Sequence, residues 1–427
     1  MRLPLRLAYG TVAHMARVAA QVAPSGESKV LRALSGRRGI RQRYQAWGRT
    51  HRDATRPLLW MHAPSVGEGL QARPVLQLMR RRRTDVQLAY SHFSPSAAGF
   101  ARSLDVDFRD YLVFDTVGDT TIALDALRPT ALVFSKLDVW PTLVRVASAR
   151  GVRLGLISAT LAAESSRRSG IGRALSADAF RRLDAVGAVD VGDAERLVSL
   201  GVRSNVIEIT GDTRYDQAWQ RAHQPSAEGA RLAASLMERP TLVAGSTWPS
   251  DESALLPAFV AVHRAAPEFR LIVAPHEPTP ARVSALEAWG RSTQLATARI
   301  GSDAAVTADV VIVDRVGILG DLYLAASIAF VGGGFHAAGL HSVLEPAAFG
   351  APVIFGPRYH RSRDAVLLVR GGGGVSVASL ELLQAQLEAW LSNAADRTDA
   401  GGRARALVRS GVGAAQRSFE LVHALVG

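Results

Sequence analysis

Short apolar runs that alternate with helix-length stretches constrain the fold of this chain more than any other feature. The first series of runs occupies residues 58–63, 86–91, 111–115, 131–135, 153–158, 185–190 and 206–211. A second series occupies residues 241–246, 270–275, 310–314, 328–333 and 351–356. Continuous apolar strands that alternate with helices are typical of parallel sheets covered by helices on both faces. The sequence therefore predicts an α/β protein with two doubly wound, Rossmann-like units in tandem.

The boundaries of the two units follow from a polar stretch between the two series that contains no strand-like run. With 427 residues the chain is long enough for two or three domains of about 100–200 residues each. We predict a basic N-terminal segment, a first domain, a linker, and a second domain that ends in helices over 379–393 and 401–426. These four parts span residues 1–57, 58–211, 212–238 and 239–427.

Polar side chains follow two strands of the first unit, at the edge where open parallel sheets bind ligands. Glu68 lies in a glycine-flanked turn after the strand that ends near His62. The helix dipole favours the ionised form of such a carboxylate, which either acts as a general base or only complements the helix N-terminus. Lys136, Asp138 and Trp140 follow another strand, where an ordinary helix start is the alternative interpretation.

Hydroxyls, imidazoles and glycines follow the strands of the second unit. A strand that runs into three consecutive glycines lets a ligand approach the backbone closely, and small hydroxyl residues with free backbone N–H groups suit a phosphate. Glu345 either accepts a hydrogen bond from a ribose or forms a capping box with Ser342. The residues at these strand ends are Ser246, Thr247, His276, Gly332, Gly333, Gly334, His341, Ser342 and Glu345.

Several chemistries find no support in the sequence. The chain has no Cys, which excludes disulfides, thiolate zinc sites, iron–sulfur clusters and a cysteine nucleophile. The three-glycine segment is neither a G-x-G-x-x-G fingerprint nor a P-loop, and no His-Glu-x-x-His zinc motif occurs. We therefore predict that the protein uses no metal and no cofactor.

The positive charge of the chain is concentrated at its N-terminus. The net charge is +12, and residues 1–60 hold twelve basic side chains against two acidic ones. A basic segment on a nearly neutral body indicates an anionic partner, either phospholipid headgroups or nucleic acid. Because no nucleic-acid reader motif accompanies the basic cluster and aromatic residues beside it are few, we predict a membrane surface and no nucleic acid.

Residues 3–23 form a predicted amphipathic helix. Its polar stripe consists of Arg6, Gly10, His14, Arg17 and Gln21, and its apolar face of Leu5, Tyr9, Val12, Met15, Ala16, Ala19 and Val22. Two arginines interrupt the stretch, so a spanning helix is not expected, and no signal-peptide cleavage pattern follows. The helix either lies in the membrane interface or packs as an ordinary surface helix on its own domain.

The strand-end residues, taken in order, resemble a known family, the 3-deoxy-D-manno-octulosonic acid (Kdo) transferases of lipopolysaccharide synthesis. These are membrane-associated glycosyltransferases of the GT-B fold, in which two Rossmann-like domains face a cleft. The resemblance rests on five blocks, which read HAPSVGE, KLDVWP, GDTRYD, GST and GLHSVLEP here and begin at residues 62, 136, 211, 245 and 339.

The resemblance implies an inverting, metal-independent transfer of Kdo from CMP-Kdo to a lipid A precursor, at the cytoplasmic face of the inner membrane. It implies that Glu68 is the general base, with Asp138 as a second catalytic residue. The implied acceptor site consists of His62, Ser65, Gly67, Arg80, Lys136 and Trp140, although Arg80 also fits a solvated helix end. The strand-end residues of the second unit form the implied donor site.

Five substitutions depart from the family pattern. Lys136 replaces a Glu and reverses its charge, Thr160 and His276 each replace an Arg, and Ser342 replaces an Asn; Asp138 is also shorter than the Glu of the family. Two alternatives therefore stay open: a GT-B enzyme that uses another nucleotide sugar, and a non-catalytic membrane-surface protein on the same fold.

Overall fold

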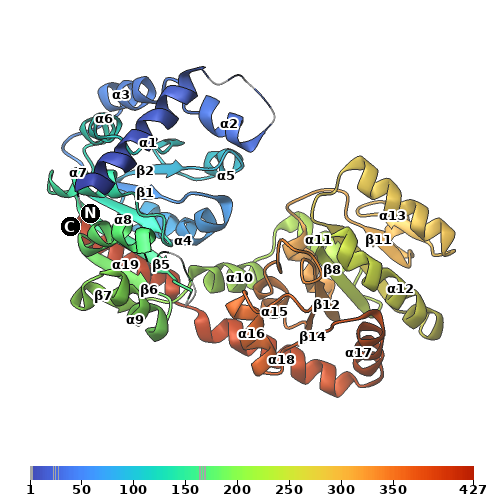
Figure 1. Cartoon of the computed structure of the whole chain (residues 1–427). Helices are drawn as coiled ribbons and strands as arrows, with labels where there is room; N and C mark the ends of the chain where they lie inside the picture. The colour runs from blue at the N-terminus through green and yellow to red at the C-terminus, as the bar shows by residue number, and fades with distance from the viewer. Residues whose placement is uncertain are drawn as a thin grey trace. The chain divides into compact units, whose positions relative to one another are not determined.

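The structure is a computed structural model that describes residues 3–22, 24, 26, 28–162, 165, 167 and 170–427 (Figure 1). It divides into two compact units. The first unit comprises the chain up to Asp216 together with Gly413–Gly427, and the second comprises Gln217–Val412. Both ends of the chain therefore belong to the first unit.

The first unit contains a seven-stranded parallel sheet in the order β3-β2-β1-β4-β5-β6-β7. Strand β1 pairs with both β2 and β4, so the strand order reverses between β1 and β4. The strands are β1 (Leu58–His62), β2 (Gln87–His92), β3 (Phe108–Tyr111), β4 (Ala131–Ser135), β5 (Arg153–Ala159), β6 (Ala185–Ala188) and β7 (Ile207–Ile209).

Helices cover both faces of this sheet because the central strands are apolar on both sides. Trp60 of β1 packs in one hydrophobic cluster with α3, α6, α7, α8 and α9, while its neighbour Met61 packs in another with α4, α5 and α19. Figure 1 shows α6 and α4 on either side of β1 and β2. The helices are α3 (Ile40–Thr50), α4 (Val66–Arg82), α5 (Ala97–Arg102), α6 (Val117–Leu127), α7 (Pro141–Ser148), α8 (Gly170–Arg181), α9 (Val191–Leu200) and α19 (Ala414–Val426).

The N-terminal helices pack onto the first unit and do not form the separate segment predicted for residues 1–57. On α3, the fully buried Tyr44 meets Phe108 edge-on with ring centroids 4.7 Å apart. On α1 (Leu3–Val22), the Tyr9 hydroxyl donates to the buried Asp115 carboxylate at 2.7 Å. A short helix α2 (Lys29–Ser35) packs against α1.

Helix α1 nevertheless keeps an exposed apolar surface. Of the predicted apolar face, Tyr9 and Ala16 are partly buried, while Val12, Met15 and Val22 are 66–78% exposed. Leu7 and Val18 are exposed beside them. One side of the helix therefore packs on the domain, and the other side is apolar and open. Among the helices of the described residues, none is long and apolar enough to cross a membrane.

The second unit contains another seven-stranded parallel sheet, in the order β10-β11-β9-β8-β12-β13-β14. Its strand order reverses at β8, which pairs with both β9 and β12. Apolar clusters line both faces. The strands are β8 (Thr241–Thr247), β9 (Arg270–Pro275), β10 (Thr297–Arg299), β11 (Val310–Ile312), β12 (Ile328–Val331), β13 (Val353–Phe355) and β14 (Gly374–Ser376). Helix α10 (Thr213–His223) begins in the first unit and continues into the second. The other helices of the second unit are α11 (Ala227–Ala234), α12 (Pro249–Ala265), α13 (Pro280–Ser292), α14 (Leu319–Leu322), α15 (Leu344–Phe349), α16 (Arg363–Arg370), α17 (Leu380–Ser392) and α18 (Ala394–Gly411).

The C-terminal helix is the largest departure from the predicted organisation. The single helix expected over 401–426 breaks near Gly413, which has a φ of 95°. The following α19 returns to the first unit and buries Val422 and Leu425 under its sheet. Asp216 holds the start of α19, because its carboxylate accepts the N–H groups of Gly413 and Ala415 at 2.8 and 2.9 Å.

The predicted linker and two strands also differ from the observed structure. Residues 212–238 are largely helical, in α10 and α11, and α11 packs against α14 of the second unit. The strand expected at 111–115 lies at 108–111, and the short strands β10 and β14 were not predicted.

Candidate active site

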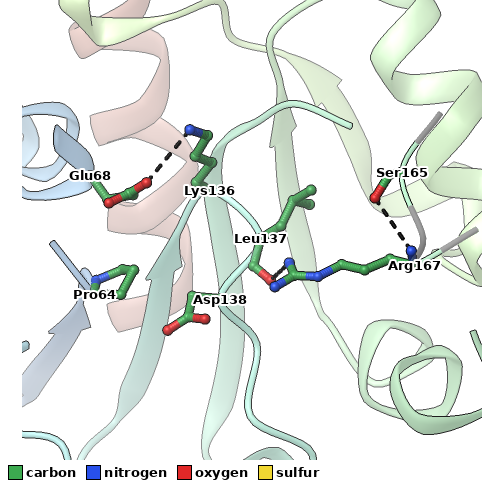
Figure 2. A pocket seen from close by; sticks show the side chains of 7 residues that line it. All are labelled: Pro64, Glu68, Lys136, Leu137, Asp138, Ser165 and Arg167. Atoms are coloured by element: carbon green, nitrogen blue, oxygen red, sulfur yellow. Dashed lines mark hydrogen bonds and ion pairs between the residues drawn. The ribbon is translucent and has the colours of Figure 1, made fainter. Parts of the chain in front are cut away.

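The topological switch point of the first sheet carries a polar pocket. Open α/β sheets bind ligands outside the carboxyl ends of their strands at the point where the strand order reverses. In this unit that point lies between β1 and β4. A pocket of about 270 Å³ opens there, lined by Pro64, Glu68, Lys136, Leu137, Asp138, Ser165 and Arg167 (Figure 2).

Glu68 and Lys136 form an ion pair in this pocket. Glu68 lies in the first turn of α4, where it accepts a hydrogen bond from the Ser65 hydroxyl. The Lys136 ammonium points at its carboxylate, with Nζ and Oε1 3.5 Å apart (Figure 2). Lys136 adopts a φ of 65°, a left-handed conformation that is uncommon for residues with a Cβ. Strained backbone of this kind is concentrated at functional sites.

Asp138 is held at the pocket by two ring donors. Its Oδ2 lies 3.2 Å from Nε2 of the fully buried His62 and accepts the Trp140 indole N–H at 3.0 Å. Burial alone would raise the pKa of Asp138, but these hydrogen bonds and the nearby imidazole outweigh it and lower the pKa. The Asp138 carboxylate is therefore ionised at neutral pH.

Contacts on both ring nitrogens fix the orientation of His62. Its Nδ1 lies 3.0 Å from both the carbonyl oxygen and the hydroxyl of Ser91, whose Oγ also accepts the Trp60 indole N–H at 2.9 Å. Its Nε2 faces Oδ2 of Asp138 and so helps to hold that carboxylate at the pocket.

The pocket can accept a proton and bind an anion or a hydroxyl. Glu68 and Asp138 provide two carboxylates, and a positioned carboxylate can act as a general base toward a hydroxyl. Lys136 provides an adjacent positive charge. Arg167 reaches into the pocket as well and donates to the Leu137 carbonyl oxygen (Figure 2).

In the second unit, aromatic and imidazole rings gather after β8, β9 and β12. The Trp248 indole stacks on His336 with centroids 4.2 Å apart and on His276 at 4.6 Å. Its N–H donates to Nε2 of His341 at 3.1 Å. Burial, together with the neighbouring imidazoles, lowers the pKa of His341 to about 4. His341 is therefore neutral at neutral pH, as it must be to accept the hydrogen bond from the Trp248 indole N–H.

The three consecutive glycines are required by the packing of the second unit itself. A Cβ at Gly332 would lie 2.2 Å from the Ser246 carbonyl oxygen, and one at Gly333 would lie 2.2 Å from that of Gly339. The Gly332 N–H donates to Gly245, and the Gly333 N–H donates to the buried Asp251 at 2.7 Å. The expectation that this segment offers its backbone to a ligand is therefore wrong for these two amides, because both already have partners.

Some of the remaining predicted donor-site residues have side chains with a hydrogen-bond or ion-pair partner, and others have side chains without such a partner among the described residues. The Thr247 hydroxyl is buried and donates to Glu252 at 2.7 Å. Glu345 lies 3.5 Å from the Arg221 guanidinium, and burial raises its pKa. Ser342 is exposed and does not cap α15, so the alternative capping box with Glu345 is not formed. Ser246, with a φ of 55°, is partly buried.

The structure separates Arg80 from the other predicted acceptor residues. Glu68 lies in the first turn of α4 and Arg80 in its last, about 18 Å apart along the helix axis. The Arg80 guanidinium pairs with Asp107 at 3.0 Å and with Asp105 at 3.5 Å. The prediction that Arg80 binds the acceptor is therefore wrong. His62, Ser65, Lys136, Asp138 and Trp140 do lie together with Glu68, and Gly67 follows Ser65 in the first turn of α4.

Sequence reasoning missed four residues of these two sites. Trp248 directly follows the Gly-Ser-Thr block, and His336 follows the glycine segment, so their positions offered a signal. Asp251 offered none, because its bonds to the loop depend on the fold. Arg167 lies in a polar stretch without any pattern. Within the ranges that the structure describes, no group of three or more His, Asp or Glu side chains is arranged to hold a metal ion.

Known proteins resemble both the sequence and the fold. A family model described as "3-Deoxy-D-manno-octulosonic-acid transferase (kdotransferase)" matches residues 38–217. The 3-deoxy-D-manno-octulosonic acid transferase of Bordetella pertussis is 30% identical over 332 residues, which cover 75% of this chain and 76% of the relative. The enzyme of the same name from Haemophilus influenzae is 24% identical, over 85% of this chain and 86% of the relative.

Solved structures agree on the architecture. The UDP-GlcNAc 2-epimerase of Neisseria meningitidis, solved with UDP-GlcNAc bound, superposes with a TM-score of 0.62 at 12% identity. The match covers 86% of this chain and all of that one. The predicted GT-B type of fold, with two tandem Rossmann-like domains, is confirmed by this likeness and by the two sheets. The 30% identity to the Bordetella pertussis relative, together with the match to the family model, establishes that the chain belongs to the 3-deoxy-D-manno-octulosonic acid transferase family of glycosyltransferases.

Proposed function

We propose that this protein transfers Kdo from CMP-Kdo to a lipid A precursor, with inversion at the anomeric carbon and Glu68 as the general base. The observation that carries the proposal is the polar pocket at the switch point of the first sheet, where Glu68 stands beside a second carboxylate, Asp138. The names of the relatives give the transferred sugar.

The chemistry assigns one role to each carboxylate. Glu68 takes the proton of the acceptor hydroxyl while the hydroxyl oxygen attacks the anomeric carbon, and the bond from that carbon to the CMP phosphate breaks. Attack from the face opposite to the leaving group inverts the configuration. Asp138, ionised and fixed by His62 and Trp140, accepts a hydrogen bond from a second acceptor hydroxyl and orients it. Lys136 and Arg167 suit an acceptor phosphate.

The donor nucleotide is proposed to bind at the carboxyl edge of the second sheet. Ser246 and Ser342 supply hydroxyls, and the rings of His276 and His341 supply polar edges beside Trp248. Glu345 accepts a hydrogen bond from the ribose. The remaining predicted residues of this site, Thr247 and Gly332 to Gly334, shape the loops around it.

A peripheral attachment to the cytoplasmic face of the inner membrane completes the proposal. The exposed apolar side chains of α1 suit the boundary between headgroups and acyl chains. The exposed Arg6, Arg32 and Arg38 suit anionic headgroups, at about 1 kcal/mol for each residue near the surface.

One observation favours a different nucleotide sugar as the second candidate. At the position where the family carries an Arg, His276 stacks on Trp248 and presents no guanidinium to the donor. A donor with another base or sugar would then be accommodated at the same edge of the sheet.

Mass spectrometry of a lipid A precursor incubated with the protein and CMP-Kdo tests the proposal. We expect the acceptor to gain the mass of one or more Kdo units, and to gain nothing from UDP-sugars. Transfer from a UDP-sugar alone would favour the second candidate. If a folded sample that binds anionic liposomes transfers sugar from none of these donors, the protein is a membrane-surface protein without this activity.

A further inference from the structure

A second cavity of the first unit has a different character from the polar pocket. It measures about 480 Å³ and lies between α1 and α2 on one side and the loops that follow β2 and β3 on the other. Ala13 and Ala33 line it from the two helices, and Phe93 and Trp140 line it from the sheet side. This volume lies within the range of ligand pockets, about 300–1,000 Å³.

The main polar groups around this cavity already have hydrogen-bond partners, so the surface that its walls offer to a ligand is mainly apolar. The Arg37 guanidinium is buried and donates to the carbonyl oxygens of Leu112, Ala33 and Phe93 at 2.8–3.1 Å. The Tyr9 hydroxyl donates to Asp115, whose two oxygens also accept the N–H groups that begin α7. A polar ligand would find few partners here, whereas an apolar ligand would replace water at a carbon surface.

The cavity shares a wall with the polar pocket. Trp140 lines the cavity and stacks on Phe93 with centroids 5.3 Å apart. Through its indole N–H, the same Trp140 holds Asp138, which lines the polar pocket. A ligand with a polar head and an apolar tail could therefore place the head beside Glu68 and the tail beyond Trp140.

The cavity also reaches the exposed apolar surface of α1. Val12 and Val30 line the cavity and are 66% and 68% exposed, so its mouth is apolar. The exposed arginines Arg6 and Arg32 lie on the same two helices and provide positive charge that complements an anionic lipid.

We propose that this cavity binds one acyl chain of the acceptor lipid and thereby selects acylated over deacylated acceptors. The inference rests on the proposed function, because it treats the polar pocket as the site of the acceptor hydroxyl. Each methylene buried in the cavity should strengthen binding about fourfold, from about 0.8 kcal/mol per CH₂.

Substitutions that fill the cavity test the proposal. Ala13→Phe and Ala33→Phe place a ring in the cavity, whereas Val191→Phe adds a similar ring at an exposed position of α9. Transfer of Kdo is measured with the acylated lipid A precursor and with the deacylated, phosphorylated disaccharide. We expect the cavity variants to raise KM for the acylated acceptor tenfold or more, and to leave KM for the disaccharide and the kcat for both unchanged. Val191→Phe should match the wild type.

A binding measurement separates this inference from the proposed function. A brominated acyl chain on the same acceptor should quench part of the tryptophan fluorescence, and Trp140→Phe or Ala13→Phe should remove that part. Quenching without any transfer would support the cavity and contradict the proposed reaction. An unchanged preference of the cavity variants for the acylated acceptor, or quenching that Ala13→Phe leaves intact, would overturn the inference.

Discussion

At the residue scale, hydrogen bonds fix the charge of groups whose chemistry the sequence leaves undetermined. The Trp248 indole can donate to His341 only if that imidazole is neutral at Nε2. Asp138 accepts from two rings and remains ionised. Each site thus contains a ring donor that selects one protonation state of its neighbour.

The protonation of His341 can be measured directly. We expect its imidazole to titrate with a pKa near 4, as monitored by NMR, because burial opposes the charged form. A pKa lowered from the usual value of about 6.5 contributes stability above that pH, and the contribution is lost as the pH falls through the folded pKa. Trp248→Phe removes the donor to Nε2 and should raise the pKa. An imidazole that titrates near 6.5 in the wild type would contradict this account.

Gly333 offers a second prediction at this scale, with a matched control. Gly333 and Gly317 have φ values of 91° and 98°, but only at Gly333 would a Cβ meet the backbone, 2.2 Å from the Gly339 carbonyl oxygen. We expect Gly317→Ala to cost about 1 kcal/mol for its backbone conformation, and Gly333→Ala to cost clearly more. Urea denaturation gives both values. Equal losses would mean that the loop relaxes and that the contact is unimportant.

At the scale of elements, the N-terminal helix α1 combines a packed side and an open side. Tyr9 and Ala20 attach it to the first unit, and Leu7, Met15 and Val22 remain exposed. Deleting the helix would disturb both sides at once, so substitution of the exposed side chains alone isolates the membrane role.

The triple variant Leu7→Gln, Met15→Gln, Val22→Gln is expected to unfold at nearly the wild-type urea concentration, because surface substitutions change stability by about 0.5 kcal/mol or less each. Flotation should show that it loses the salt-resistant part of its binding to anionic liposomes. The attraction of Arg6 and its basic neighbours should remain and should fade with salt, because the Debye length at physiological salt is about 8 Å. The variants Val191→Gln and Leu382→Gln serve as controls, because these two side chains are similarly exposed on other helices. Unchanged flotation of the triple variant at high salt would exclude α1 as the anchor.

At the scale of the whole molecule, the two α/β units could be predicted from the sequence because buried parallel strands are apolar throughout. This pattern can be recognised without knowing which strands pair. It also placed Glu68 and Asp138 at one edge of a sheet, since strand ends of a parallel sheet converge. It did not predict the return of α19 to the first unit, which depends on the distant carboxylate of Asp216. Nor did it predict the position of Arg80, because a helix places its two ends at opposite edges of the sheet.

One departure from the family pattern, Lys136, lies in the polar pocket itself. Lys136 reverses the charge of a family residue, and the structure shows what that reversal does: the lysine pairs with Glu68. The ion pair keeps the Glu68 carboxylate in the pocket, so the reversal does not displace the proposed base.

The central claim is that Glu68 removes the proton of the acceptor hydroxyl. The most direct test is the rate of Kdo transfer from CMP-Kdo to lipid A precursor by Glu68→Gln, with Glu195→Gln on the exposed side of α9 as control. Loss of the base should lower kcat by about 10²–10⁴ while the urea midpoint stays near that of the wild type, and the control should keep full activity. A Glu68→Gln variant that transfers Kdo at the wild-type rate would contradict the mechanism.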